Sequence, residues 1–289
     1  MIDYWLPGWF VKFEKKYSGN RKLTDIEWVD LRQRIKQFEV ENPIVSICIP
    51  AWNEEENILR TIASLANNKF DFPCELIVVN NNSTDNTQAL LNDLGIRSFM
   101  EMNQGIAHAR RRGLLESKGK YHLCCDSDTV YPPEWIKTMT EALQKNEQNG
   151  VACVYGSYSF LPSSVNGRPV MAIYETATSI IRMFKPQKTE ALRVLGFNFG
   201  FIREIALQVN GFKMDNPRKF RNEFGSAGYV YRSEDGIMAS HIKKAGYKLL
   251  FINNRKSRAW TSDRRLIIDG GLMRAAAHRL IKLFTAKKL

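Results

Sequence analysis

Two aspartates separated by one residue are the strongest candidates in this sequence for a functional site. Asp126 and Asp128 directly follow the apolar run 121–125. If that run is a strand, alternating side chains place both carboxylates on one face, about 6 to 7 Å apart. Mg²⁺ and Mn²⁺ prefer carboxylate oxygens, and Mg²⁺ usually takes one or two of them together with substrate phosphates. The pair predicts a divalent cation and a phosphorylated substrate, unless Asp-Ser-Asp merely closes a strand with turn-forming residues.

The elements that must position these aspartates alternate between strands and helices from residue 44 onward. We expect strands at 45–50, 75–80, 97–102, 121–125, 151–160, 196–202 and 248–253. We expect helices at 55–66, 87–94, 106–116, 170–184 and from 234 to about 244. Residues 210–233 show no period and read as an irregular substrate loop. Alternating units of this length predict an α/β fold, a mainly parallel sheet with helices on both faces.

Polar clusters follow three of the expected strands. They are residues 50–54, 80–85 and 126–128. Ligands of such sheets bind beyond the carboxyl ends of the strands, so the three clusters predict one site. Neither G-x-G-x-x-G nor a Walker motif follows any strand, which disfavours a dinucleotide-dependent dehydrogenase or a P-loop enzyme.

Composition is that of a globular chain, with 44% apolar residues among 289. No apolar stretch approaches the roughly 20 residues that cross a bilayer, and no secretory signal is evident. The five cysteines include no C-x-x-C spacing. We therefore expect reduced thiols and a cytoplasmic protein.

Positive charge is concentrated at one end of the chain. The net charge is +12, and residues 251–289 hold ten Lys or Arg against two Asp. Residues 272–284 form an amphipathic pattern with apolar and basic halves. This pattern predicts a helix at the inner membrane surface, or alternatively a helix that packs on its own domain. Because the charge is not spread over the chain, no nucleic-acid partner is expected.

Five motifs in order resemble those of family 2 glycosyltransferases with the GT-A fold. They are residues 45–55, 78–87, 103–110, 126–128 and 234–235, and the resemblance covers about residues 44–250. It implies the nucleotide-diphospho-sugar transferase fold. We expect a helical lead-in over 1–43, a nucleotide-sugar-binding half over 44–155, an acceptor-binding and catalytic half over 156–254, and the basic tail over 255–289.

The resemblance also assigns the donor side. Glu54 accepts hydrogen bonds from ribose hydroxyls, and Arg110 lies near the nucleotide unless it belongs to a solvated helix face with Arg111 and Arg112. Asn81 stands where the family usually has Asp; its amide oxygen can accept from the base without charge assistance. The identity of the base therefore stays open: a UDP-sugar is favoured, and a GDP-sugar is the alternative. The implied nucleotide-sugar-binding residues are Pro50, Ala51, Trp52, Glu54, Asn81, Arg110, Asp126 and Ser127.

For the reaction, the resemblance implies metal-dependent transfer with inversion. Asp128, with Asp126, would bind Mn²⁺ or Mg²⁺ at the diphosphate, where the cation neutralises the leaving group. Asp235 would take the proton of the acceptor hydroxyl, with Glu234 beside it. The other interpretation of Glu234 and Asp235, acids at a helix start capped by Ser233, is compatible with this role.

Two further segments resemble family members less closely. Basic residues within 260–265 would approach the diphosphate, and 196–201 would face the acceptor, with aromatics that stack on a sugar or pack in the core. The processive Q-x-x-R-W motif is missing, which favours transfer of a single sugar to a glycan or lipid-linked acceptor. The alternatives are a non-catalytic nucleotide-sugar-binding module at the membrane and a sugar nucleotidyltransferase, whose Gly-rich first loop this sequence lacks.

Overall fold

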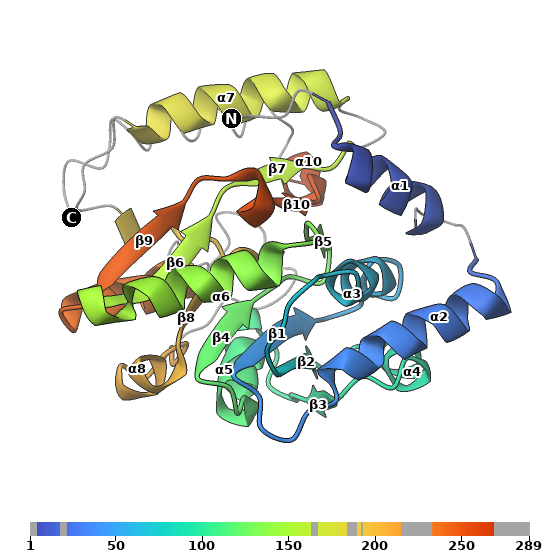
Figure 1. Cartoon of the computed structure of the whole chain (residues 1–289), viewed down its shortest axis with the longest axis horizontal. Helices are drawn as coiled ribbons and strands as arrows, with labels where there is room; N and C mark the ends of the chain where they lie inside the picture. The colour runs from blue at the N-terminus through green and yellow to red at the C-terminus, as the bar shows by residue number, and fades with distance from the viewer. Residues whose placement is uncertain are drawn as a thin grey trace.

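A seven-stranded sheet forms the centre of the protein. The computed structural model describes residues 5–17, 22–162, 167–183, 190–191, 193–214 and 233–268. The strand order is β3-β2-β1-β4-β8-β6-β9 (Figure 1). The strands are β1 (Val45–Ala51), β2 (Cys74–Asn80), β3 (Ser98–Met100), β4 (Tyr121–Cys124), β6 (Val151–Gly156), β8 (Phe199–Ile202) and β9 (Lys248–Ile252). Every pairing is parallel except those of β8 with β4 and β6. The prediction of a mainly parallel sheet is confirmed.

Helices cover both faces of this sheet. They include α3 (Ile58–Ala66), α4 (Thr87–Asp93), α5 (Ile106–Glu116), α6 (Trp135–Asn146), α8 (Arg203–Gln208) and α9 (Glu234–Lys244). Strand β1 is buried along its whole length. Its alternating side chains divide between the faces: Ile47 and Ile49 belong to the main core with residues of α3, whereas Cys48 packs with Ala109 of α5.

Helix α3 begins at Ile58, later than the expected residue 55. The backbone N–H groups of Glu54 and Glu55 donate to Thr87 and Asp85 of the neighbouring loop, at 2.9 and 3.1 Å. Glu54 and Glu55 therefore lie in the loop at the edge of the sheet and not in α3. Helix α6 was not among the expected elements.

A second, three-stranded sheet lies beside the first, in the order β5-β10-β7. It consists of β5 (Thr129–Val130), β10 (Ala259–Thr261) and β7 (Tyr158–Phe160), and α7 (Arg168–Met183) and α10 (Arg264–Ile268) adjoin it (Figure 1). The expectation of one strand over 151–160 is wrong, because β6 pairs with β9 and β7 with β10. The chain passes from the first sheet to the second at Ser157, between β6 and β7. There the side-chain amide of Asn198 donates to the carbonyl of Ser157 at 2.6 Å.

The N-terminal helices α1 (Gly8–Tyr17) and α2 (Asp25–Ile35) and the short η1 (Lys36–Phe38) lie against the main core. Thr24 begins α2 with a capping box shared with Glu27, which satisfies two otherwise unpaired N–H groups. Phe10 of α1 stacks on Trp260 of β10, with 5.2 Å between ring centroids. The first helix is thereby joined to the small sheet.

All five cysteines are free and buried. Within the described ranges, no helix is long and apolar enough to cross a membrane. The amphipathic pattern predicted over 272–284 lies outside the described residues, as does most of the irregular segment 210–233.

Candidate active site

The loops after β1 and β2 are joined to each other at the carboxyl edge of the sheet. The backbone N–H of Asn53 donates to the Ser83 hydroxyl at 2.9 Å, and the N–H of Thr84 donates to Asn53 Oδ1 at 2.8 Å. Asn53 and Asn82 have φ of 53° and 58°, a left-handed conformation that asparagine adopts more readily than most residues. Each loop thus turns sharply and presents its polar side chains beyond the strand ends.

The predicted donor residues of β1 gather at this edge. Pro50 and Ala51 end the strand and are buried, and Trp52 follows them half-buried. The Glu54 carboxylate is buried and accepts from Asn57 Nδ2 at 2.8 Å. It also accepts from Arg264 Nη2 at 2.7 Å, across 210 residues of sequence.

Asn81, at the end of β2, is held by the loop before α5. Its side-chain nitrogen donates to the carbonyls of Glu101 and Asn103, at 2.8 and 2.7 Å. Its side-chain oxygen accepts from the N–H of Gly105 at 2.8 Å. Asn81 is buried, and these three contacts fix the orientation of its side chain.

The loop carrying Asp126, Ser127 and Asp128 follows β4 and is fixed from both sides. The backbone N–H of Asp126 donates to the Tyr131 hydroxyl at 3.1 Å, and that hydroxyl donates to the Phe197 carbonyl at 2.8 Å. The carbonyl of buried Ser127 accepts from the Thr61 hydroxyl at 2.8 Å. Tyr131 was not among the predicted site residues.

Arg110 joins the donor side of the site to the expected base. Its Nη2 lies 2.7 Å from Asp126 Oδ1, and its Nε lies 3.4 Å from Asp235 Oδ1 and 3.6 Å from Glu234 Oε1. Only 2% of the arginine is exposed, so the interpretation as a solvated helix face is wrong. One buried cation therefore links carboxylates from the end of β4 and the start of α9.

Burial and charge set the protonation of this cluster. Burial, and then the negative charge of Glu234, raises the pKa of Asp235 well above that of an ordinary aspartate, although Arg110 acts in the opposite direction. Burial also disfavours the charged form of Arg110, yet Asp235 and Asp126 outweigh it and keep its pKa well above the usual value. Asp235 is thus a buried carboxylate with enhanced proton affinity, as a general base needs.

Helix α9 begins where its capping residue predicts. Ser233 is the N-cap, and its hydroxyl accepts from the N–H of Gly236 at 3.2 Å. Glu234 and Asp235 occupy the first turn and are both buried. The prediction that these two acids stand at a helix start capped by Ser233 is confirmed. It is compatible with their position beside Arg110.

Gly196 holds the second oxygen of Asp235. Its N–H donates to Asp235 Oδ2 at 2.8 Å. Phe199 and Phe201, in the same segment, are fully buried, so core packing rather than sugar stacking accounts for them. The sequence reasoning placed Gly196 in the acceptor-side segment without seeing this contact.

We expect Gly196→Ala to impair the site strongly. A Cβ at this position would stand 2.6 Å from Asp235 Oδ1 and would collide with the Arg110 guanidinium, so one of these side chains must move. Displacing a catalytic group by about 1 Å costs on the order of 100-fold in rate, which steady-state kinetics would measure. Gly8→Ala is the control, since nothing lies within 4 Å of its added methyl group. Equal rates for the two variants would contradict this role of Gly196.

Arg264, the first residue of α10, reaches the donor side from the C-terminal part of the chain. Its Nη2 contacts both Glu54 Oε1 at 2.7 Å and Asp128 Oδ2 at 3.3 Å. The position of Arg264 agrees with the prediction that a basic residue of 260–265 approaches this part of the site. Its role toward a diphosphate stays a prediction.

The donor set of Asp126 and Asp128 fits a hard divalent cation. Their side chains are 28% and 19% exposed, so a ligand can reach their oxygens. No group of three or more potential metal ligands occurs among the described residues. Two carboxylates suit Mg²⁺ or Mn²⁺, which completes its shell with water and substrate phosphate oxygens.

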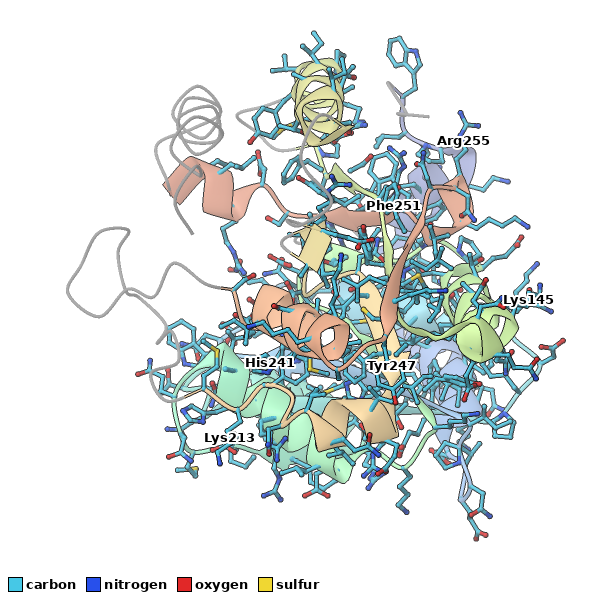
Figure 2. The ribbon with its side chains drawn as sticks, turned by 90° about the vertical axis from the view of Figure 1, so that its left-hand side faces the viewer. Lys145, Lys213, His241, Tyr247, Phe251 and Arg255 are labelled. Carbon is cyan, nitrogen blue, oxygen red and sulfur yellow. The ribbon has the colours of Figure 1, made fainter. Side chains whose placement is uncertain are left out.

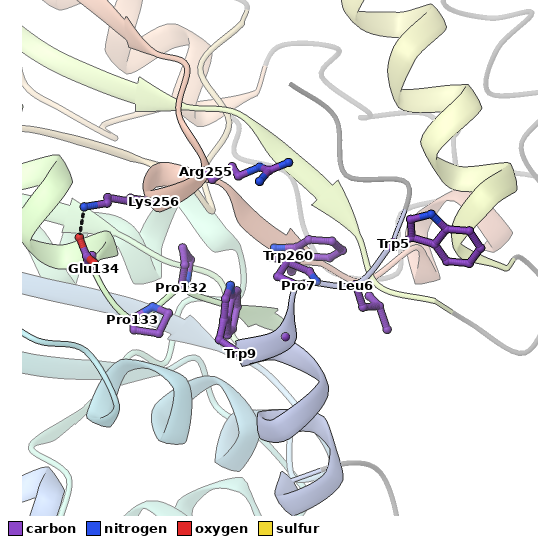
Figure 3. Close-up of a pocket in the computed structure, with 11 residues that line it drawn as sticks. Trp5, Leu6, Pro7, Trp9, Pro132, Pro133, Glu134, Arg255, Lys256 and Trp260 are labelled. Atoms are coloured by element: carbon purple, nitrogen blue, oxygen red, sulfur yellow. Dashed lines mark ion pairs between the residues drawn. The ribbon is translucent and has the colours of Figure 1, made fainter.

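A cavity of about 830 Å³ lies on the opposite side of β10 from this acidic site. Trp260 lines the cavity, whereas the neighbouring Thr261 points the other way and bonds to Thr129, beside Asp128, at 3.1 Å. The other walls come from residues 5–9, 132–134 and 255–256 (Figure 3). The cavity is therefore separate from the site that contains Asp126 and Asp128.

The fold and site together define a glycosyltransferase of the GT-A fold: a mainly parallel sheet, an Asp-x-Asp loop at its carboxyl edge, and a buried carboxylate on a facing helix. Glycosyl transferase family 2 matches residues 46–208, more than half of the chain. The chain belongs to this family, and the predicted family resemblance is confirmed.

Curated relatives share part of this chain. The poly-beta-1,6-N-acetyl-D-glucosamine synthase of Staphylococcus epidermidis is 27% identical over 157 residues, 52% of this chain and 35% of that protein. The dolichyl-phosphate beta-glucosyltransferase of Dictyostelium discoideum is 26% identical over 140 residues, 43% of each chain. The chain thus spans less than half the length of these two relatives.

Solved structures show the same fold. A mannosyltransferase from Pyrobaculum calidifontis, in complex with GDP-Man and Mn²⁺, superposes with a TM-score of 0.52 at 18% identity, over 82% of this chain and 64% of that one. GalNAc-T7 with UDP, GalNAc and Mn²⁺ gives a TM-score of 0.55 at 14% identity, over 86% and 54%. The predicted GT-A fold class is confirmed.

Proposed function

We propose that this protein transfers a single sugar from a nucleotide diphosphate sugar to an acceptor hydroxyl, with inversion and with the help of a divalent cation. The observation that carries the proposal is the Arg110 bridge, which joins Asp126 on the donor side to Asp235 on α9. Direct displacement needs a donor and a base on opposite sides of one sugar carbon. The bridge supports such an arrangement because it fixes both carboxylates to one cation.

On the donor side, Glu54 would bind the ribose, and Pro50, Ala51 and Trp52 would line the base. The side-chain oxygen of Asn81 would accept from an N–H of the base, and a UDP-sugar is favoured over a GDP-sugar. Asp126 and Asp128 would hold Mn²⁺ or Mg²⁺, which when bound neutralises the charge that develops on the departing diphosphate. Arg264 would exchange its carboxylate partners for the diphosphate.

On the acceptor side, Asp235 would accept the hydroxyl proton as the oxygen attacks the anomeric carbon. The raised pKa of Asp235 suits this step, since a base with enhanced proton affinity takes the proton more readily. The negative charge of Glu234 would support the proton affinity of Asp235. The acceptor would be a glycan or a lipid-linked glycan, with the basic residues 251–289 drawn to the inner membrane surface.

The experiment that tests the proposal is a panel of UDP- and GDP-sugars, with release of nucleoside diphosphate as the readout. We expect release from at least one donor in the presence of an acceptor. Donor binding without release from any of them would contradict catalysis and favour the non-catalytic nucleotide-sugar-binding module. The nucleotidyltransferase alternative predicts no release of nucleoside diphosphate; inorganic pyrophosphate would instead convert the nucleotide sugar to a nucleoside triphosphate and a sugar 1-phosphate, which analysis of the nucleotide products detects.

Removal of the cation should stop the reaction. We expect EDTA to abolish diphosphate release and Mn²⁺ or Mg²⁺ to restore it. Asp128→Asn should lower the apparent affinity for Mn²⁺ by about 10- to 100-fold, because the cation loses a charged ligand. Thr129→Val is the neighbouring control: it removes a hydroxyl 3.4 Å from Asp128 but keeps both carboxylates. Full activity in EDTA would contradict the metal dependence.

A further inference from the structure

Over residues 168–180, the outward face of α7 is apolar and uncharged. The inward face packs Met171 and Tyr174 against Leu266 of α10. Between residues 168 and 180, the exposed side chains are Pro169, Val170, Ile173, Ala177, Ser179 and Ile180. Val170, Ile173 and Ile180 are 51%, 63% and 50% exposed, and their spacing places them on one stripe of the helix. Such a face marks an interaction site.

Trp5 is a further exposed aromatic residue. Its side chain is 80% exposed, and it comes from the N-terminal segment at the rim of the cavity (Figure 3). In both Figure 1 and Figure 2, α7 and the N-terminal segment occupy the same end of the molecule. Tryptophan combines an apolar ring with an N–H donor, which favours the boundary between a bilayer and water.

Positive charge borders the same end. Arg255 and Lys256 line the cavity that Trp5 also lines, and Figure 2 shows Arg255 at the end occupied by α7. Lys256 is 62% exposed at its side chain and pairs with Glu134. In the sequence, residues 269–289 hold five Lys or Arg against one Asp, and they lie outside the described residues.

We propose that the docking surface, defined as Trp5, Val170, Ile173 and Ile180, binds an anionic lipid bilayer. An uncharged apolar helix face, a flanking tryptophan and bordering cations are the features that hold a protein at an anionic membrane surface. The exposed apolar residues of α2 differ, because Ile26 and Val29 are interspersed with Asp25, Asp30 and Arg32, as on a solvated face.

Docking through this surface would bring the active site to the membrane. Leu266 packs against α7 while Arg264, two residues earlier on α10, contacts Glu54 and Asp128. This consequence rests on the proposed function, whereas vesicle binding does not require a donor or acceptor. A failure of vesicle binding and a failure of sugar transfer are therefore separate results.

The test is cosedimentation of the full chain with phosphatidylglycerol–phosphatidylcholine vesicles, in the absence of donor. We expect Ile173→Asp with Ile180→Asp to weaken binding by about tenfold or more, because two charges enter the apolar layer. The matched control is Ile26→Asp with Val29→Asp, which makes the same change of net charge at positions of α2 that are 82% and 65% exposed. We expect this control to keep binding within about twofold of the unchanged protein.

Equal vesicle binding by the two double variants would overturn the proposal, since the basic residues of 251–289 alone would then account for the binding. Absence of binding by the unchanged protein would also overturn it. Sedimentation velocity without vesicles tests the competing occupant, a second copy of the chain. A dimer that the α7 double variant dissociates would assign this face to self-association and overturn the bilayer proposal. Unchanged thermal unfolding of both variants excludes misfolding as the cause of a loss.

Discussion

Asp235→Asn is expected to lower kcat by about 10²- to 10⁴-fold, the contribution of a positioned general base. The amide keeps the shape of the side chain and cannot take a proton from the acceptor hydroxyl. Donor binding should survive, because the donor-side contacts of Glu54, Asn81 and Asp128 do not involve Asp235. Steady-state diphosphate release and calorimetric donor titration measure the two quantities separately.

Two companion variants control this experiment. Glu234→Gln should lose less activity, since Glu234 supports the charge of the cluster without taking the proton. Asp71→Asn changes a surface carboxylate that pairs with Lys137 and is 75% exposed at its side chain, and it should change nothing. Undiminished turnover in Asp235→Asn would remove Asp235 from its proposed role.

Arg110→Met is expected to destabilise the protein by about 3–5 kcal/mol at neutral pH, the usual cost of removing one partner from a buried ionic group. The substitution leaves Asp126, Glu234 and Asp235 without their shared cation. Urea unfolding measures the loss. Arg112→Met is the matched control: its side chain is 42% exposed and pairs with Glu116 along the same helix, a contact worth about 0.5 kcal/mol or less. Equal stability of the two variants would show that the bridge is energetically unimportant.

The same variant makes a prediction about pH. Arg110 is a cause that lowers the pKa of Asp235, so its removal should raise that pKa further. A carboxylate with a raised folded-state pKa favours the folded state most at low pH, and this contribution is lost as pH rises toward the raised pKa. The stability deficit of Arg110→Met should therefore shrink in acid, and its residual activity should appear at higher pH than in the unchanged protein.

Much of the fold was predictable because hydrophobic runs and periodicity act locally. The strands β1, β2 and β4 and the helix α5 appear within a residue or two of their expected bounds. The split of 151–160 into β6 and β7 falls at Gly156 and Ser157, but the partner strands β9 and β10 that place the two halves in different sheets lie about 100 residues further on. No local pattern records a partner that distant.

The site was predictable in its residues and less so in its connections. The motif resemblance named Arg110, Asp126 and Asp235, and the structure brings all three together. The contact of Gly196 with Asp235 was not visible, because a backbone N–H leaves no mark on the sequence beyond the choice of glycine. The structural support from Tyr131 was missed because its hydroxyl acts on a main-chain group in another loop.

The contact between Arg264 and Glu54 spans 210 residues of sequence. During synthesis, the loop after β1 leaves the ribosome long before α10 does, since the N-terminal part of a chain is made and folds first. Glu54 and Asp128 therefore meet their arginine only after residue 264 has emerged. A nascent chain that stops short of α10 carries the three strand-end loops but lacks Arg264, so ribosome-stalled intermediates should acquire these contacts only after α10 has emerged.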